Sequence, residues 1–269
     1  MFQKALENVK SHKPLVHTIT NLVSINDCAN ILLACGASPI MAENELEVEE
    51  IAANSDGLVL NTGTPSVQKF TAMLKAGLAA NHAGIPVVLD PVGVGASSFR
   101  RENICRLLKK IHFSAIRCNQ SELFTLSEGV SAEKGVDTTL TGLSLEHTAL
   151  LARKFAGQHQ TVVAVTGKVD IITDGKRIAV IKNGSPVLAR ITGAGCMLSA
   201  LTGAFCASNP DLFTAVAAAV GLVGLCGERA EQNMYLKHTG SGSFRVCLID
   251  EVSLISPVEL QGGIRVEYL

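Results

Sequence analysis

Residues 190–208 of this chain read RITGAGCMLSALTGAFCAS. Residues 192–195 are small enough for a flexible turn, and apolar side chains then recur at helical spacing from Met197 to Phe205. The stretch therefore predicts a glycine turn that opens a helix. The first N–H groups of a helix lack intrahelical partners and lie at the positive end of its dipole, where they can bind a phosphate or an oxyanion. Cys196 lies at this start, although a packing turn with a buried cysteine and no chemistry fits the same pattern.

The composition indicates a compact α/β protein that acts on a small molecule. The 269 residues are 47% hydrophobic, with a formal net charge of -1. This length can bury a substantial core without an evident boundary, so we expect a single domain over residues 1–269. Because there is no run of Lys or Arg, the phosphate attraction needed for nucleic-acid binding has no source. The most apolar stretch, residues 212–226, is too short to span a bilayer and is expected to be a buried core helix, so no membrane partner is expected.

Eight cysteines are scattered along the chain without a Cys-x-x-Cys pair or a His cluster at zinc spacing. This pattern supports neither a structural zinc site nor a redox motif. The N-terminal segment is amphipathic and charged, unlike a signal peptide. We therefore expect mostly buried thiols in a reducing compartment, the cytoplasm.

Short apolar runs, each suited to a strand buried on both faces, alternate with segments of helical length. The runs cover residues 14–21, 57–61, 85–90, 114–117 and 161–166. This alternation predicts an α/β fold with a mostly parallel central sheet and helices on both faces. Residues 171–181 predict an antiparallel hairpin near one edge, turning on Asp174-Gly175. Ligands bind at the carboxyl ends of parallel strands, so the polar ends of these runs and the turn at 192–196 predict one pocket.

The polar residues at these strand ends suit phosphoryl transfer, which requires positioning and positive charge around the moving group. The sequence has no Walker loop, dinucleotide fingerprint or nucleophile-elbow serine. Asp90 and Glu122 could hold Mg2+ directly or through water. From spacing alone it is more common that such an Asp caps the turn before a proline and that such a Glu lies on an exposed helix face. Arg117 could grip phosphates or form a surface ion pair, and Thr166 could donate to a phosphate or simply be a β-branched residue at a strand end.

Three residues near the ends of the first two apolar stretches are expected to have different roles. Asn21 could orient a polar ring atom of a substrate. His17 is expected to be a hydrogen-bonded structural histidine. Met41 belongs to a residue type found more often in the core than against a ligand.

Seven motifs spread over nearly the whole chain together resemble hydroxyethylthiazole kinase of thiamine salvage, a family of the ribokinase-like superfamily. They are VHTITN (16–21), SPIM (38–41), LNTGT (60–64), LDPVGVG (89–95), RCN with SE (117–119 and 121–122), VTGKVD (165–170) and TGAGCML (192–198). The resemblance implies the ribokinase-like three-layer α/β/α fold. It also implies transfer of the γ-phosphate of ATP to the hydroxyl of 4-methyl-5-(2-hydroxyethyl)thiazole.

The same resemblance implies a role for each matched residue. The implied roles are Mg2+ binding for Asp90 and Glu122; ATP binding for Arg117, Thr166 and Asn119; an anion hole for Gly193, Ala194, Gly195 and Cys196; and thiazole binding for Asn21, Met41 and Gly193. Because the family forms trimers with active sites between subunits, we expect a homotrimer in which Met41 contributes to a neighbouring chain's pocket.

Two cysteines stand at positions where relatives carry another residue. Ribokinase-like enzymes usually have Asp where this chain has Cys196, a cysteine that hydroxyethylthiazole kinases share. A carboxylate is ionised at neutral pH, whereas an ordinary thiol is mostly protonated. Cys196 is therefore expected to be a modest base or only a hydrogen-bonding group, and Cys196→Asp to retain or raise turnover. At Cys118 the family usually has glycine, so a backbone that required a positive φ there would strain this side chain.

Two other functions remain open at this point. The first is a related kinase acting on the hydroxymethylpyrimidine half of thiamine, but those relatives normally keep Asp at position 196. The second is a sensor that binds thiazole or nucleotide without catalysis. A pure binder would not need Asp90, Glu122, Arg117 and Thr166 together, and ADP release with the thiazole alcohol separates the two.

Overall fold

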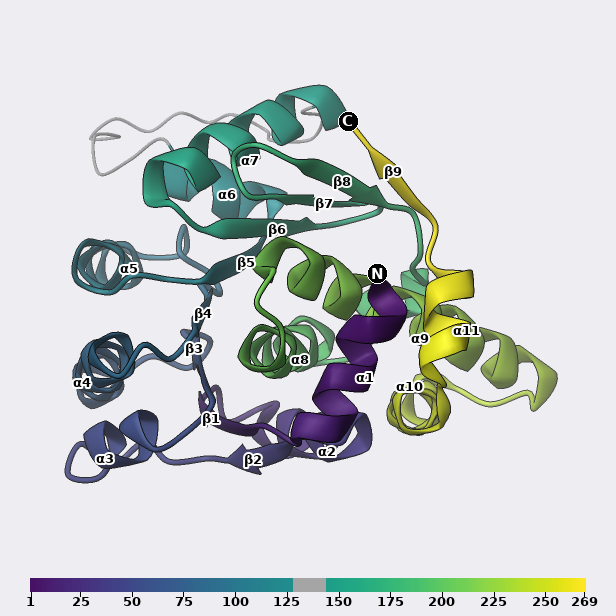
Figure 1. Cartoon of the computed structure of the whole chain (residues 1–269), viewed down its shortest axis with the longest axis horizontal. Helices are drawn as coiled ribbons and strands as arrows, with labels where there is room; N and C mark the ends of the chain where they lie inside the picture. The colour runs from purple at the N-terminus through teal and green to yellow at the C-terminus, as the bar shows by residue number, and fades with distance from the viewer. Residues whose placement is uncertain (128–143) are drawn as a thin grey trace.

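A nine-stranded sheet runs through the centre of the computed structural model, which describes residues 1–127 and 144–269 (Figure 1). The strands are β1 (Leu15–Ile19), β2 (Ser38–Ile40), β3 (Gly57–Asn61), β4 (Val87–Asp90), β5 (Ala115–Asn119), β6 (Val162–Thr166), β7 (Asp170–Thr173), β8 (Ile178–Ile181) and β9 (Val266–Tyr268). Their spatial order is β2-β1-β3-β4-β5-β6-β7-β8-β9. Neighbours from β2 to β6 are parallel, and neighbours from β6 to β9 are antiparallel. The expected parallel sheet with an antiparallel hairpin near one edge is confirmed.

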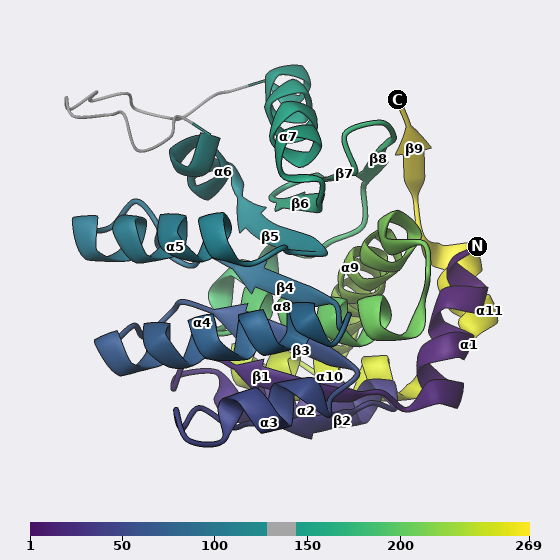
Figure 2. The same ribbon diagram turned by 60° about the vertical axis from the view of Figure 1, so that its left-hand side comes forward.

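Helices cover both faces of this sheet, which gives the three layers seen in Figure 1; Figure 2 turns the molecule so that one of the two helical layers comes forward. One face carries α3 (Val48–Ala53), α4 (Val67–His82), α5 (Ser98–Lys110), α6 (Gln120–Ser127) and α7 (Leu145–His159). The other carries α1 (Phe2–His12), α2 (Ile25–Cys35), α8 (Ala194–Ser208), α9 (Leu212–Leu236), α10 (Ser241–Leu254) and α11 (Pro257–Gly263). A short 3-10 helix, η2 (Pro186–Arg190), leads into the turn before α8. Each face has its own hydrophobic cluster, because strands such as β3 and β4 are buried on both sides.

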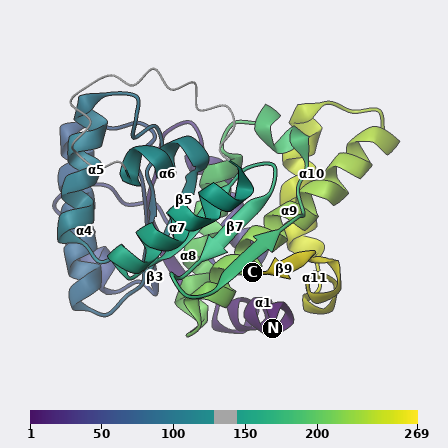
Figure 3. The ribbon, with the colours of Figure 1, turned by 90° about the horizontal axis from the view of Figure 1, so that it is seen from above.

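The two ends of the chain meet beside α11. The N-terminal amine donates a 2.9 Å hydrogen bond to Gln261, and the Tyr268 hydroxyl lies 3.4 Å from the sulfur of Met1. Figure 3 shows both termini on this side of the molecule. Strand β9 and its pairing with β8 were not predicted from the sequence, because a strand of three residues is too short to show an alternation of apolar and polar side chains.

Helix α9 is the long apolar helix of the core. Among the described residues it is the one helix long and apolar enough to cross a membrane, and 78% of its most apolar 18-residue window is buried within the protein. The expected core helix at residues 212–226 is confirmed. The whole helix runs from Leu212 to Leu236, ten residues beyond this apolar stretch.

The backbone at Cys118 shows no strain of the kind considered above. Cys118 lies inside β5 opposite Val165 of β6, and it is not among the residues with positive φ in the described part of the chain. Its side chain is fully buried in the cluster beneath α4, α5 and α7. A side chain is therefore accommodated there without a left-handed backbone, and burial raises the pKa of this thiol.

We expect Cys118→Gly to lower the free energy of unfolding by about 2 kcal/mol, because it removes buried atoms and places glycine inside a strand. Cys118→Ala should lose about half as much. Urea unfolding of the three proteins measures the difference. A glycine variant as stable as the parent would show that the cysteine does strain β5.

Candidate active site

The carboxyl ends of five parallel strands bring the polar residues of the sequence motifs to one edge of the sheet. Asn61 and Asp90 are directly paired at the ends of β3 and β4. Asn119 and Thr166 are paired in the same way at the ends of β5 and β6, and Asn21 follows β1 by two residues. Sheet register thus places side chains far apart in the sequence next to one another, with α8 beginning above them.

Asp90 is the most buried acid of this group, with no exposed surface. Its Oδ2 accepts hydrogen bonds from Asn61 Nδ2 at 2.8 Å and from Ser199 Oγ at 2.7 Å. Its Oδ1 has no hydrogen-bond partner and lies 3.6 Å from Arg117 Nη1. Burial raises the pKa of Asp90 to about 6, while the Arg117 charge and the hydrogen bond from Ser199 oppose the shift. Because its bonds run to β3 and α8, Asp90 is not a cap for the turn before Pro91.

Arg117 is a partly buried cation that connects β5 to β6. Its Nη2 donates a 2.6 Å hydrogen bond to Thr166 Oγ1. Although burial works against the charge, the carboxylates of Asp90 and Glu122 raise the pKa of Arg117. With 16% of its side chain exposed, Arg117 is not part of a surface ion pair. It presents a fixed positive charge at the sheet edge.

Glu122 points into this site from the first turn of α6. Its Oε1 accepts from the Gly93 N–H and its Oε2 from the Asn119 N–H, both at 2.9 Å. The residue is 9% exposed, so the alternative of a solvated helix face is wrong. Among the described residues there is no group of three or more His, Cys, Asp or Glu side chains that could enclose a metal. Any metal here would therefore have two carboxylates, with water and a ligand's oxygens as further donors.

The turn before α8 leaves the helix start open toward these groups. Helices α4, α5 and α7 begin with a serine whose hydroxyl accepts a backbone N–H, whereas α8 begins at Gly193 with no side-chain cap. Gly193 has φ +88°, and a Cβ there would lie 2.8 Å from the Cβ of Ser24. A Cβ on Gly195 would lie 2.5 Å from Arg117 Nη1, so the helix start stands directly over the guanidinium. Unpaired N–H groups and a cation converge there, as an anion requires.

Cys196 occupies the third position of α8 and is half-buried. Its Sγ accepts hydrogen bonds from Asn21 Nδ2 at 3.0 Å and from Asn61 Nδ2 at 3.3 Å. Asn21 Oδ1 in turn accepts from the Ser24 hydroxyl at 2.8 Å. The sulfur is therefore held by two amide donors at the edge of the same site.

The other two candidates near β1 and β2 lie away from these contacts. His17 is buried, and its Nε2 is 2.8 Å from the Ala42 carbonyl oxygen. This contact fits the structural histidine that the sequence led us to expect. Met41 is half-buried and packs against the core cluster on the α8 side of the sheet.

Several residues of the site had no role assigned to them from the sequence, although Asn61 lies within the LNTGT motif. Asn61 and Ser199 both bind Asp90, and Lys69 donates to the Thr20 carbonyl at 2.9 Å and pairs with Glu43 at 3.0 Å. The guanidinium of Arg100 donates to the carbonyls of residues 62, 63 and 92 and so joins the loops after β3 and β4. The available signals were weak: Asn61 ends a predicted strand, and Ser199 follows Cys196 by one helical turn.

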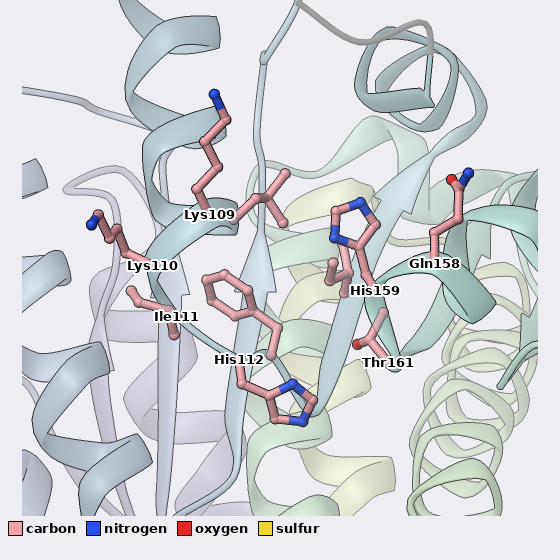
Figure 4. A pocket seen from close by; sticks show the side chains of 10 residues that line it. Lys109, Lys110, Ile111, His112, Gln158, His159 and Thr161 are labelled. Atoms are coloured by element: carbon pink, nitrogen blue, oxygen red, sulfur yellow. The ribbon is translucent and has the colours of Figure 1, made fainter.

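A separate cavity of about 290 Å³ lies between the C-terminal ends of α5 and α7, away from these strand ends. Its basic lining residues do not converge: Figure 4 shows Lys109, Lys110 and His112 pointing in different directions. Basic residues at helix C-termini stabilise the helix dipole. That structural role accounts for Lys109, Lys110 and His159, and the basic side chains do not converge, so this cavity is not the candidate active site.

Comparison with known proteins agrees with this geometry. The family model described as "Hydroxyethylthiazole kinase family" matches residues 6–257. Hydroxyethylthiazole kinase from Clostridium acetobutylicum is 44% identical over 272 residues, covering 99% of each chain. The solved structure of a hydroxyethylthiazole kinase protein from Pyrococcus horikoshii OT3 is 36% identical, covers 100% of this chain and 98% of its own, and superposes with a TM-score of 0.89.

A more distant solved structure shows the same fold. It is a ribokinase-like superfamily protein from Enterococcus faecalis, 16% identical over 93% of each chain, with a TM-score of 0.62. At this identity the likeness concerns the fold alone, and it agrees with the three layers described above. Full-length identity to the first relative and the family match together decide the assignment: the chain belongs to the hydroxyethylthiazole kinase family.

Proposed function

We propose that this protein transfers the γ-phosphoryl group of ATP to the hydroxyl of 4-methyl-5-(2-hydroxyethyl)thiazole, as part of thiamine salvage. Membership of the family supports the reaction. The observation that carries it is Asp90: a fully buried carboxylate with one unpaired oxygen, beside Arg117 and below the uncapped start of α8. Phosphoryl transfer depends mainly on such fixed charges and oriented N–H groups.

The residues present fit a magnesium ion at Asp90 and Glu122. Asp90 Oδ1 is a buried oxygen without a hydrogen-bond partner, and the two oxygens of Glu122 are held in place by backbone N–H groups. Two carboxylates with water and phosphate oxygens are a typical donor set for Mg2+. When bound, Mg2+ neutralises charge on the transferring phosphoryl group.

On the nucleotide side, we assign Arg117, Thr166 and Asn119 to the phosphates of ATP. Arg117 is already oriented by Thr166, so little side-chain freedom is lost when a phosphate binds. The open N–H groups of Gly193–Cys196 face the same guanidinium and would hold the reacting oxygens.

On the alcohol side, we assign Cys196, Asn21, Gly193 and Met41. Both N–H groups of Asn21 are engaged, one with Asn61 and one with Cys196. Its Oδ1 keeps one lone pair beyond the bond from the Ser24 hydroxyl, and that lone pair can accept the substrate hydroxyl. In this arrangement Asn21 binds the alcohol rather than the ring nitrogen of the thiazole.

We further propose a single domain over residues 1–269 that acts as a cytoplasmic homotrimer with active sites between subunits. Large exposed apolar side chains support this: Leu22 and Val23, which follow Asn21, are each 67% exposed, and Leu46 is 94% exposed. The eight cysteines are all free, as is usual in a reducing compartment. Light scattering at micromolar protein tests the trimer, and a monomeric mass would refute it.

The decisive experiment measures Mg2+-dependent ADP formation from ATP with the thiazole alcohol, with hydroxymethylpyrimidine and with no acceptor. Turnover with the thiazole alcohol supports the proposed reaction. Turnover with the pyrimidine alone would instead identify the related kinase. A folded protein that binds nucleotide without producing ADP would be a sensor.

We expect Cys196→Asp to retain or raise kcat. Two amide N–H groups already point at this position, and a carboxylate accepts hydrogen bonds more strongly than sulfur. Steady-state assays at saturating substrates measure the effect, with Cys196→Ala as the variant that has no acceptor. A near-complete loss of activity in a folded Asp variant would contradict the prediction.

A further inference from the structure

Asn61, the last residue of β3, contacts both sides of the proposed site. It bonds to Asp90 on the nucleotide side and to Asn21 and Cys196 on the alcohol side. Its side chain is 1% exposed and makes all four hydrogen bonds available to an amide. Oδ1 accepts from the Gly63 N–H at 2.9 Å and from Asn21 Nδ2 at 3.1 Å. Nδ2 donates to Asp90 Oδ2 at 2.8 Å and to Cys196 Sγ at 3.3 Å.

The direction of the Asn61 amide is set by neighbouring groups that can only donate or only accept a hydrogen bond. A backbone N–H only donates, so Gly63 fixes the oxygen end. The nitrogen end then faces Asp90, whose oxygen also accepts from Ser199. This pair of donors occupies Oδ2 of Asp90 and leaves Oδ1 as the oxygen without a partner.

The direction of Asn21 follows from that of Asn61. Because Asn61 presents its oxygen, Asn21 must turn its nitrogen toward it, and the second N–H of Asn21 then reaches Cys196. Ser24, the other partner of Asn21, cannot fix this direction because a hydroxyl both donates and accepts. Without Asn61 the Asn21 amide could rotate by 180° and present oxygen to the sulfur.

We propose that Asn61 is a positioning residue that couples Asp90, on the nucleotide side, to Asn21 and Cys196, on the alcohol side. The inference rests on the proposed function of the site and adds a residue to it. Asn61 touches neither substrate in this scheme; it acts by fixing which atoms of Asp90 and Asn21 face them. Such supporting partners typically contribute about 10- to 100-fold in metal affinity or activity.

The test uses Ser199→Ala as the matched control, because Ser199 donates to the same oxygen of Asp90 as Asn61, and none of its hydrogen bonds reaches Asn21 or Cys196. Two quantities are measured for each protein. Calorimetry gives the affinity of the metal-free, nucleotide-free protein for the thiazole alcohol. ADP formation at varied Mg2+ gives the concentration needed for half-maximal rate.

We expect Ser199→Ala to raise the Mg2+ requirement about tenfold and to leave the affinity for the alcohol unchanged. Asn61→Ala should raise the Mg2+ requirement and also weaken alcohol binding about tenfold. Asn61→Asp keeps the oxygen that faces Gly63 and Asn21, and with it the direction of the Asn21 amide, but replaces the nitrogen that donates to both Asp90 and Cys196. Asn61→Asp should therefore keep the affinity for the alcohol and raise the Mg2+ concentration needed for half-maximal rate. It replaces Asn61→Ala in the test if the alanine variant does not fold.

Thermal unfolding of each variant separates these effects from loss of structure. The inference is overturned if Asn61→Ala raises only the Mg2+ requirement, as Ser199→Ala does, or if it weakens only alcohol binding. In either case Asn61 does not couple the two sides. An Asn61→Asp variant that loses alcohol binding while folded would also overturn it. Failure of the unmodified protein to bind the alcohol or to form ADP would instead refute the proposed function.

Discussion

Asp90→Asn is expected to lower kcat on the order of a thousandfold, the largest effect of any single substitution considered for this protein. The change is nearly isosteric, so Asn61 and Ser199 keep an acceptor at Oδ2. The amide nitrogen would then replace Oδ1, the buried oxygen that has no hydrogen-bond partner and forms an ion pair with Arg117. The substitution thus places an N–H donor against the Arg117 guanidinium. It also removes the negative charge that we assign to Mg2+ binding.

Stopped assays of ADP formation at saturating ATP, Mg2+ and thiazole alcohol measure the loss. Asp174→Asn is a suitable control because it makes the same chemical change at the β7–β8 turn, where Asp174 pairs with Arg177. That variant should keep kcat within about twofold, since an exposed ion pair contributes little. If Asp90→Asn retained a tenth of the parent rate, Asp90 would not be the carboxylate on which transfer depends.

The strand ends show why part of this site could be predicted from the sequence. Asp90, Asn119 and Thr166 each terminate an apolar run, and parallel strands place their carboxyl ends at one edge. The hairpin was predictable from Asp174-Gly175, because Gly175 has φ +87° at the turn. Each of these features depends on residues that are close together in the sequence, so the sequence pattern alone can reveal it.

Other features depend on contacts that no local pattern encodes. The pairing of Asn61 with Asp90 depends on sheet register, and the direction of each amide depends on which backbone N–H lies nearby. The concern about Cys118 arose because sequence comparison gives a residue type but no φ, and here the strand is extended. Residues 128–143 lie outside the described residues, and no site assignment falls on them.

Gly195→Ala is expected to reduce kcat/KM for ATP about 100-fold while leaving the fold intact. Position 195 is helical and does not have a positive φ, so the backbone accepts alanine. The new Cβ would lie 2.5 Å from Arg117 Nη1 and 2.9 Å from its Cζ, so the guanidinium must move. Because Arg117 is held by Thr166 and Asp90, any shift breaks the geometry that we assign to phosphate binding.

The stability of this variant should change little, which distinguishes displacement from unfolding. Alanine is favoured over glycine by about 1 kcal/mol within a helix, and this gain offsets part of the cost of moving Arg117. Gly157→Ala in α7 is the matched control, because a Cβ there meets nothing within 4 Å. That control should gain stability with unchanged kinetics. If Gly195→Ala bound ATP as tightly as the parent, the start of α8 would not be the phosphate site and the role of Arg117 would have to be reassigned.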